Sequence, residues 1–456
     1  MANEIETVQL SYVTKIIKRG ISPKYDEFEG APVLNQRCIR NNIISWELAR
    51  KNNLLKKKIP EDRWLEKFDV LVNSTGVGTL GRVAQLIMIS EPSTVDSHVT
   101  IVRPKTSEID PYFFGFAIRS KEYEIEALGE GSTGQTELSR HRLAEIEIPI
   151  LPLPEQKAIA HVLGSLDDKI ELNRRMNETL EAMAQALFKS WFVDFDPVID
   201  NALAIGKKVP EDLRERAAAR AALGDKRKPL PEEIRTLFSN EFTFSDELGW
   251  IPVGWEVGPL KEIASLKTTS IQPKNEPETV WVHFSIPAFD ENRLPNNELG
   301  DTIKSGKYKV PPTAVLASKL NPQFPRVWLP DVENDETAIC STEFMPFVPL
   351  DERERPFLFV LLSSSIIQEE IASRATGSTG SRQRVKPRDI EGMSVLKPPK
   401  DLRIQFSNLA DSYYLKVTAN IRVARHLANL RDTLLPKLLT GELRIPDAEK
   451  MVEGLA

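Results

Sequence analysis

The chain has 456 residues, 41% of them hydrophobic, which is enough to bury the cores of two or three domains. Its two cysteines, Cys38 and Cys340, form neither a disulfide framework nor a C-x-x-C metal motif, and they fit the reducing cytoplasm. No run of about 18 apolar residues occurs, so a membrane-spanning helix is not expected, and the net charge of -6 argues against a uniformly basic DNA-binding protein.

The first half of the chain is repeated in the second half. Residues 131–134 and 377–380 both read Gly-Ser-Thr-Gly, 246 positions apart (377 minus 131). Near the start of each half, five apolar, proline and lysine positions recur 250 residues apart (260 minus 10): Leu10, Val13, Ile21, Pro23 and Lys24 match Leu260, Ile263, Ile271, Pro273 and Lys274. Repetition on this scale predicts a duplicated architecture.

Along the chain, residues 1–152 contain short β-branched runs such as DVLVNST and VTIVRP, separated by turn residues. Residues 153–192 have helical spacing, and 193–249 form a charged, Ala-rich helical connector without a counterpart. Residues 250–399 repeat the first domain, 400–440 repeat the helix, and 441–456 form a tail. The sequence therefore predicts an α+β protein with two pseudo-repeated α/β domains and two long helices.

Each long helix carries apolar residues at steps of three and four, which is typical of a coiled-coil seam. The predicted seams run through Ile159, Val162, Leu166, Met176, Leu180, Met183 and Leu187, and through Phe406, Leu409, Tyr413, Val423, Leu427, Leu430 and Leu434. Two polar positions, Lys169 and Asn173, recur 247 residues later as Lys416 and Asn420. We expect the helices to pair, with these polar residues fixing their register; the alternative is that each seam packs on its own domain.

Several phrases resemble the specificity subunits of type I restriction-modification systems: LGWIPVGWEV, the two GSTG loops, PLPEQKAIAHVLGSLDDKI, ALFKSWFVDFDPV and LRDTLLPKLLTGELRI. The resemblance implies two target-recognition domains that read a split double-stranded DNA site, separated by two antiparallel helices. It also implies a non-catalytic, cytoplasmic subunit that docks two methyltransferase subunits and, through them, restriction and translocation subunits. No cofactor is then expected on this chain, whereas S-adenosylmethionine, ATP and Mg are expected in the partner subunits.

Loops supported by a sheet are the expected place for base and phosphate contacts. Arg and Lys would contact guanine edges or phosphate, Asn and Gln would contact adenine, and hydroxyls would mainly contact phosphate. In the first domain the candidates are Lys24, Asn73, Ser74, Thr75, Arg82, Ser132, Thr133, Gln135 and Arg140. In the second they are Lys274, Lys319, Asn321, Gln323, Arg326, Ser378, Thr379, Arg382, Gln383, Arg384 and Lys386.

Two motifs favour an enzyme but lack its context. Residues 76–81 form a literal GxGxxG, yet a β-type segment follows where a nucleotide-binding helix is needed, so a hairpin is predicted. Residues 321–324 resemble the Asn-Pro-Pro-aromatic loop of adenine methyltransferases, but Gln323 replaces the second proline. Two alternatives therefore stay open beside the specificity subunit: a DNA-binding enzyme with its own methyltransferase or nuclease centre, and a coiled-coil scaffold without a nucleic-acid role.

Overall fold

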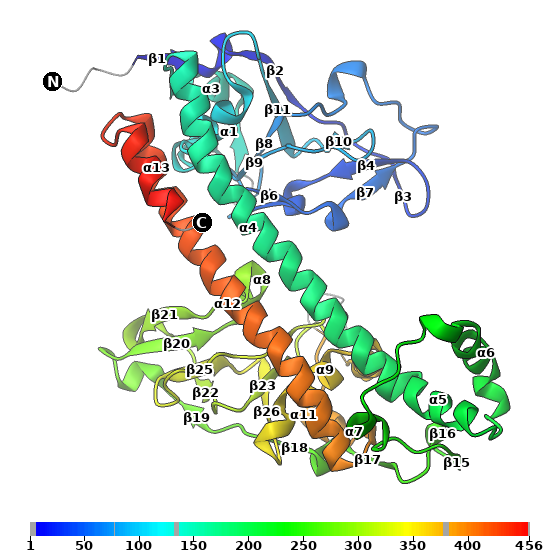
Figure 1. Ribbon diagram of the computed structural model, residues 1–456. Helices are drawn as coiled ribbons and strands as arrows, with labels where there is room; N and C mark the ends of the chain where they lie inside the picture. The colour runs from blue at the N-terminus through cyan, green and yellow to red at the C-terminus, as the bar shows by residue number, and fades with distance from the viewer. Residues whose placement is uncertain (1–5, 77, 132–135, 377–382, 455–456) are drawn as a thin grey trace. The chain divides into compact units, whose positions relative to one another are not determined.

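The computed structural model (Figure 1) describes residues 6–76, 78–131, 136–376 and 383–454. Its contacts divide the chain into two units. The first comprises residues 1–172 and 424–456, and the second comprises residues 173–423. Both long helices, α4 (Leu153–Phe188) and α12 (Lys400–Leu439), contribute one part to each unit.

The first unit contains two four-stranded sheets. One is antiparallel throughout, with the order β2-β11-β8-β9. The other has the order β10-β4-β7-β3, in which β10 and β4 are parallel. The strands are β2 (Thr14–Arg19), β3 (Tyr25–Asp26), β4 (Ala31–Leu34), β7 (Arg50–Asn52), β8 (Val70–Asn73), β9 (Val83–Gln85), β10 (Thr94–Val95) and β11 (Val99–Pro104), with two-stranded additions β1 (Thr7–Gln9) with β14 (Glu147–Pro149), β5 (Ile39–Arg40) with β6 (Ile43–Ile44), and β12 (Gly129–Glu130) with β13 (Glu137–Leu138).

Strand β8 is buried on both faces of its sheet. Its side chains alternate between the two faces, and a separate core covers each face. Val70 and Val72 pack in the core that contains the helices, whereas Leu71 packs in a separate core with residues of the second sheet. The β8–β9 hairpin confirms that the GxGxxG motif joins two strands and does not begin a helix.

The helices of the first unit close one face of this sheet. They are α1 (Pro111–Arg119), α2 (Glu122–Ala127), α3 (Arg140–Glu145) and α13 (Ile445–Glu453), together with the parts of α4 and α12 that belong to the unit. Asp110 caps α1 by accepting bonds from the backbone N–H groups of Tyr112 and Phe113.

The second unit repeats the antiparallel sheet of the first. Its order β18-β26-β23-β24 corresponds strand for strand to β2-β11-β8-β9, and a five-stranded sheet β19-β22-β25-β20-β21 packs beside it. The bounds are β17 (Glu256–Pro259), β18 (Ala264–Leu266), β19 (Ser270–Ile271), β20 (Val280–Phe284), β21 (Asn296–Leu299), β22 (Lys307–Lys309), β23 (Val315–Ser318), β24 (Val327–Trp328), β25 (Ala338–Ser341), β26 (Phe344–Pro349) and β27 (Ser394–Lys397), with helices α8 (Ile286–Asn292), α9 (Arg355–Ser363), α10 (Ser365–Ser373) and α11 (Pro387–Glu391). The predicted pair of pseudo-repeated α/β domains is confirmed.

Within each unit, the parts of α4 and α12 run antiparallel. In the first, Asp167 pairs with Arg431, while Ile159, earlier in α4, lies beside Leu438, later in α12. In the second, Asn177 bonds Asn420, and Phe188 lies 5.7 Å from Phe406 between ring centroids. The two long antiparallel helices are therefore confirmed, while the finer domain boundaries stay predictions.

The predicted seam is wrong at several positions. Met176 and Met183 are 38% and 46% exposed, and Val423 is 48% exposed. Ala184 and Phe188 are buried instead. An α-helix has 3.6 residues per turn, so apolar residues on either of two neighbouring faces can recur at steps of three and four. The spacing alone therefore does not identify which of the two faces is buried.

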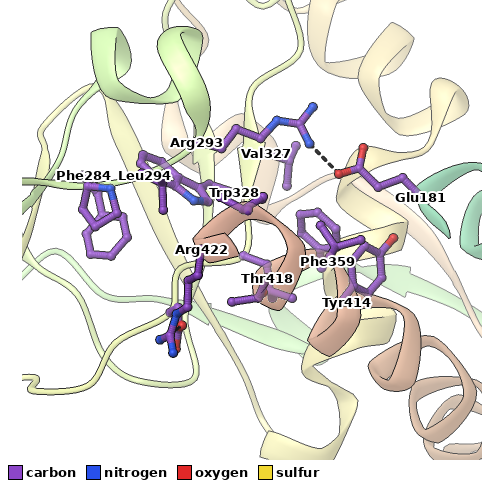
Figure 2. Close-up of a pocket in the computed structure, with 15 residues that line it drawn as sticks. Glu181, Phe284, Arg293, Leu294, Val327, Trp328, Phe359, Tyr414, Thr418 and Arg422 are labelled. Atoms are coloured by element: carbon purple, nitrogen blue, oxygen red, sulfur yellow. Dashed lines mark hydrogen bonds and ion pairs between the residues drawn. The ribbon is translucent and has the colours of Figure 1, made fainter. Parts of the chain in front are cut away.

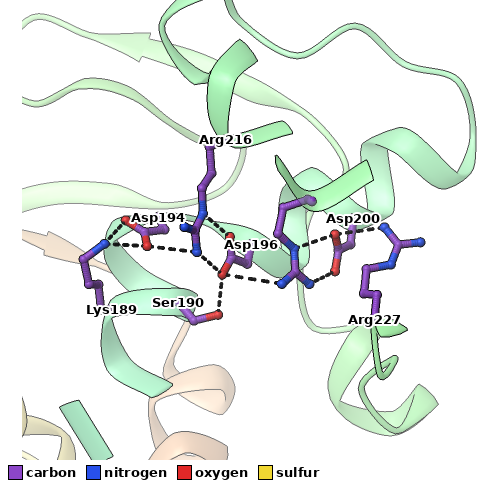
Figure 3. A network of polar contacts seen from close by, with 8 residues as sticks. Lys189, Ser190, Asp194, Asp196, Asp200, Arg216 and Arg227 are labelled. Atoms are coloured by element: carbon purple, nitrogen blue, oxygen red, sulfur yellow. Dashed lines mark hydrogen bonds and ion pairs between the residues drawn. The ribbon is translucent and has the colours of Figure 1, made fainter. Parts of the chain in front are cut away.

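The connector after α4 begins with a π-helical turn at Lys189–Val193 and continues through α5 (Asp196–Ala204), α6 (Arg214–Ala222) and α7 (Glu232–Arg235), followed by the β15 (Phe242–Ser245) and β16 (Gly249–Pro252) hairpin. Figure 3 shows the ion-pair network that joins α5 to α6. Arg216 bonds both carboxylate oxygens of Asp196 at 2.7 Å, and Arg220 and Arg227 bond Asp200. The connector is therefore a folded element of the second unit.

The second domain packs against the long helices around a small pocket (Figure 2). Apolar side chains from the domain, including Phe284 and Trp328, face Tyr414 and Val417 of α12. An ion pair between Arg293 and Glu181, 2.6 Å apart, borders the pocket on the α4 side. Within the described part of the chain, no helix is long and apolar enough to cross a membrane.

Candidate nucleic-acid interface

Both domains build the same small structure at the end of their third sheet strand. In the first domain, the segment after β8 pairs with residues 136–138: the backbone N–H of Leu138 donates to the carbonyl of Ser74 at 2.8 Å, and Gly76 donates to Thr136. In the second, the backbone N–H of Val385 donates to the carbonyl of Lys319 at 3.1 Å, and Asn321 donates to Gln383 at 2.8 Å. We call these the first and second strand-end sites.

The identical bonding pattern aligns the two sites residue by residue. Thr75 forms an isolated bridge with Glu137, and Leu320 forms the same bridge with Arg384. Glu137 and Arg384 therefore occupy one equivalent position, which we call the bridge position. In the sequence, the Gly-Ser-Thr-Gly motif ends three positions before Glu137 and four positions before Arg384.

In the first strand-end site, several candidate residues face inward. Asn73 and Ser74 are fully buried; Asn73 donates to the carbonyl of Gln36, and the Ser74 hydroxyl bonds Thr100. These two side chains thus support the loop from the interior of the domain. Thr75 is partly exposed, and its hydroxyl lies 2.8 Å from Nδ1 of the exposed His98.

Gln36 and His98 belong to this site but were absent from the sequence-based candidates. The Gln36 side chain accepts a bond from Thr75, although the two residues are 39 positions apart. Next to His98, Asp96 is 5% exposed, and burial raises the pKa of its carboxyl while the backbone N–H of His98 opposes that rise. No local sequence signal links these segments, because the pairing of β10 with β4 and of β8 with β11 brings them together.

In the second strand-end site, two arginine side chains form ion pairs with carboxylates. Arg384 bonds both oxygens of the Glu343 carboxylate, with Nη2 to Oε1 at 2.8 Å and Nε to Oε2 at 3.1 Å. These hydrogen bonds raise the pKa of Arg384. Arg326 is held in the same way by Asp290, at 2.6 and 2.8 Å. Glu343 is a further residue that the sequence did not indicate.

The remaining candidates fall into two groups. Six of them lie outside the described residues: Ser132, Thr133, Gln135, Ser378, Thr379 and Arg382. The others are at the surface or partly buried: Lys24, Arg140, Lys274, Gln323 and Lys386 are exposed, and Arg82, Lys319, Asn321 and Gln383 are half-buried. Their DNA contacts stay predictions.

The helix-register candidates also occupy different environments. Asn420 is 3% exposed and bonds Asn177 at 2.8 Å, whereas Lys416 is exposed and lies outside the buried seam. Lys169 and Asn173 are half-buried and have polar contacts of their own. Among the residues that the structure describes, no three His, Cys, Asp or Glu side chains are grouped so that they could hold a metal ion.

Residues 3–182 match the protein family described as the Type I restriction modification DNA specificity domain. The chain is 25% identical to the type I restriction enzyme HindI specificity subunit of Haemophilus influenzae, over 94% of this chain and 98% of that one. It is 26% identical to the MjaIX specificity subunit of Methanocaldococcus jannaschii, over 93% and 90% of the two chains. A crystal structure of a type I system S subunit from M. genitalium overlaps with a TM-score of 0.48, at 16% identity and 96% coverage of both chains.

Proposed function

Because the chain belongs to the family of type I restriction-modification specificity subunits, we propose that it reads a bipartite DNA site and directs the partner subunits of such a complex to it. Each recognition domain takes one half-site. Base-edge contacts carry sequence information, so two domains with different contact residues are suited to an asymmetric target.

The duplicated strand-end site is the observation that carries this proposal. The same four-residue bonding pattern recurs, but the side chains on it differ: Ser74, Thr75 and Glu137 correspond to Lys319, Leu320 and Arg384. Of these, Glu137 and Arg384 are exposed. A repeated backbone that presents unlike exposed side chains at one equivalent position is what two readers of different sequences need. The acidic net charge does not oppose this, because the pairing of Lys319 with Val385 places three cations, Lys319, Lys386 and Arg388, near one another.

We further propose two methyltransferase subunits as direct partners, with restriction and translocation subunits joining through them. Met176 and Val423 are equivalent in the repeat (176 plus 247) and both are exposed apolar residues, on α4 and α12 respectively. Exposed apolar side chains at matched places favour the docking of one partner on each helix. Leu172 on α4 and Leu409 and Leu415 on α12 are exposed apolar residues as well.

Catalysis is assigned to those partners, since the relatives of the chain are specificity subunits. S-adenosylmethionine, ATP and Mg would accordingly bind the partner subunits. Calorimetric titration of the purified chain with S-adenosylmethionine checks this assignment: we expect no heat of binding, and stoichiometric binding would instead favour an enzyme with its own methyltransferase centre.

The decisive experiment is co-expression with the methyltransferase subunit of the same system, followed by mapping of N6-methyladenine in the DNA of the host. A split, asymmetric motif that requires this chain is the expected result. Methylation that is the same with and without the chain would overturn the proposal and favour the scaffold alternative.

A further inference from the structure

Arg384 is held rigidly at the bridge position of the second strand-end site. Its backbone N–H donates to the carbonyl of Thr376 at 3.0 Å, and the N–H of Thr376 donates back at 2.9 Å. On its other side it bridges Leu320. The backbone at this position is therefore fixed between two neighbouring segments.

The side chain of Arg384 is fixed as well, but Glu343 does not engage all of its N–H donors. A guanidinium has five N–H donors, and Glu343 engages the edge formed by Nε and Nη2. The edge formed by Nη1 and the outer hydrogen of Nη2 bonds no described residue, and the side chain is 47% exposed. Glu343 is itself anchored, because its carbonyl accepts from Lys319 and its N–H donates to the hydroxyl of Ser341.

An exposed ion pair contributes little to stability, so stability does not account for this arrangement. The pair is electrically neutral, which weakens its general attraction for phosphate. It nevertheless keeps two parallel N–H donors oriented outward. Such a pair of donors matches the N7 and O6 acceptors on the major-groove edge of guanine, whereas a lysine or a free arginine suffices for phosphate.

The first domain has the reverse charge arrangement at the same position. Glu137 is 62% exposed and forms an ion pair with Arg19, whose Nη2 also donates to the carbonyl of Leu138 at 2.7 Å. A carboxylate at the bridge position is an acceptor, and in the major groove it would pair with an amino group such as N4 of cytosine. The same backbone position thus presents donors in one domain and acceptors in the other.

We infer that the bridge position is a specificity-determining position in each domain: Arg384, positioned by Glu343, reads a guanine in the second half-site, and Glu137, positioned by Arg19, reads a base amino group in the first. This rests on the proposed DNA-reading function. In this arrangement Glu343 and Arg19 are positioning residues, which need not contact DNA.

The test maps methylation motifs for the complex that contains the full-length chain, in wild-type form and with Arg384→Ala, Glu343→Gln or Glu137→Gln. Asp351→Asn is the matched control, because Asp351 holds the exposed Arg353 by the same two-nitrogen contact, at 3.0 and 2.6 Å, outside the strand-end site. We expect Arg384→Ala and Glu343→Gln to relax one guanine position of the second half-site by about 5- to 150-fold. Glu137→Gln should relax one position of the first half-site, and the control should change neither.

A second measurement uses the wild-type complex, so it does not depend on the folding of a variant. Replacing that guanine by 7-deazaguanine in a duplex removes N7, and we expect binding to weaken by about fivefold or more. A second half-site without a G·C pair, unchanged binding to the 7-deazaguanine duplex, or variants that weaken all sites equally with an unchanged motif would each overturn the inference while leaving the proposed function intact. The absence of any motif that depends on the wild-type chain would instead count against the proposed function.

Discussion

Asn420 on α12 donates a hydrogen bond of 2.8 Å from Nδ2 to Oδ1 of Asn177 on α4. Asn420 is 3% exposed, so its amide depends on this partner. The position equivalent to Asn177 in the second helix is Ala424 (177 plus 247), so the repeat cannot make a second copy of the bond. A buried polar pair of this kind specifies one register of two helices at some cost in stability.

We expect Asn177→Ala to lower the free energy of unfolding of the second unit by about 1–3 kcal/mol, because the Asn420 amide is left buried without a partner. The double variant Asn177→Leu/Asn420→Leu should regain stability, since both polar groups are removed together. Urea unfolding followed by circular dichroism measures both effects. The exposed Asn408 of α12 provides the control: Asn408→Ala should change little, and a double variant less stable than Asn177→Ala would contradict the argument.

The duplicated fold was predictable because matching residues recur at a nearly constant spacing along the chain. The strand orders β2-β11-β8-β9 and β18-β26-β23-β24 follow directly from that duplication. The buried side of each long helix was not predictable in detail. Met176 and Ala184 are both apolar, and the sequence does not state which stripe faces the neighbouring helix and which stays exposed.

The position of the candidate site along the backbone was predictable from the sequence, whereas the ion-pair partners of its charged side chains were not. Loop residues near Asn73 and Asn321 were indicated by strand ends and by the neighbouring repeat. That Arg384 is held by Glu343, 41 positions away, and Arg326 by Asp290, 36 positions away, depends on which strands pair. Sequence spacing carries no information about such long-range partners.

The connector should become sensitive to acid through Asp196. This carboxylate is 2% exposed, and although burial raises its pKa, the hydrogen bonds from Arg216 and Ser190 outweigh burial and leave the pKa below 3.8. A depressed pKa means that the charged form contributes stability above about pH 3.8, and that this contribution is lost as the pH falls through the lower pKa of the folded state.

Hydrogen exchange in α5 and α6 measures this contribution. At neutral pH, Asp196→Asn should accelerate exchange by about five- to 100-fold, because Arg216 loses a charged, two-oxygen partner. Toward pH 3 the difference between the variant and the wild type should shrink. Asp212→Asn removes an exposed carboxylate of the same connector and should have no effect at either pH. A difference for Asp196→Asn that does not change with pH would contradict the role of its ionisation.

The two cysteines should report the opening of the two units separately. Cys38 lies in the first unit and Cys340 in the second, and both are fully buried. Burial raises the pKa of the Cys38 thiol to about 11 and that of Cys340 to about 12, so little reactive thiolate forms at neutral pH. We expect neither thiol to react with Ellman's reagent within minutes in the native protein. Titration with urea of the Cys38→Ser and Cys340→Ser variants should then give one unfolding curve for each unit, and rapid reaction without denaturant would show that the burial is not maintained.

Two glycines of the first unit should respond to alanine in opposite ways. A Cβ on Gly20 would lie 1.9 Å from the carbonyl oxygen of Val95 and 2.5 Å from that of Asp96. Gly20→Ala must therefore move the backbone that follows β2 away from the backbone at the end of β10. We expect a loss of about 2–4 kcal/mol in the free energy of unfolding. Gly164 lies within α4, where a Cβ would meet nothing within 4 Å. Gly164→Ala should therefore stabilise the helix by about 0.5–1 kcal/mol, because glycine loses more backbone entropy than alanine on folding. Urea unfolding of the two variants, followed through the Cys38 thiol, measures both effects in the same unit; equal stability of the two would contradict the close approach at Gly20.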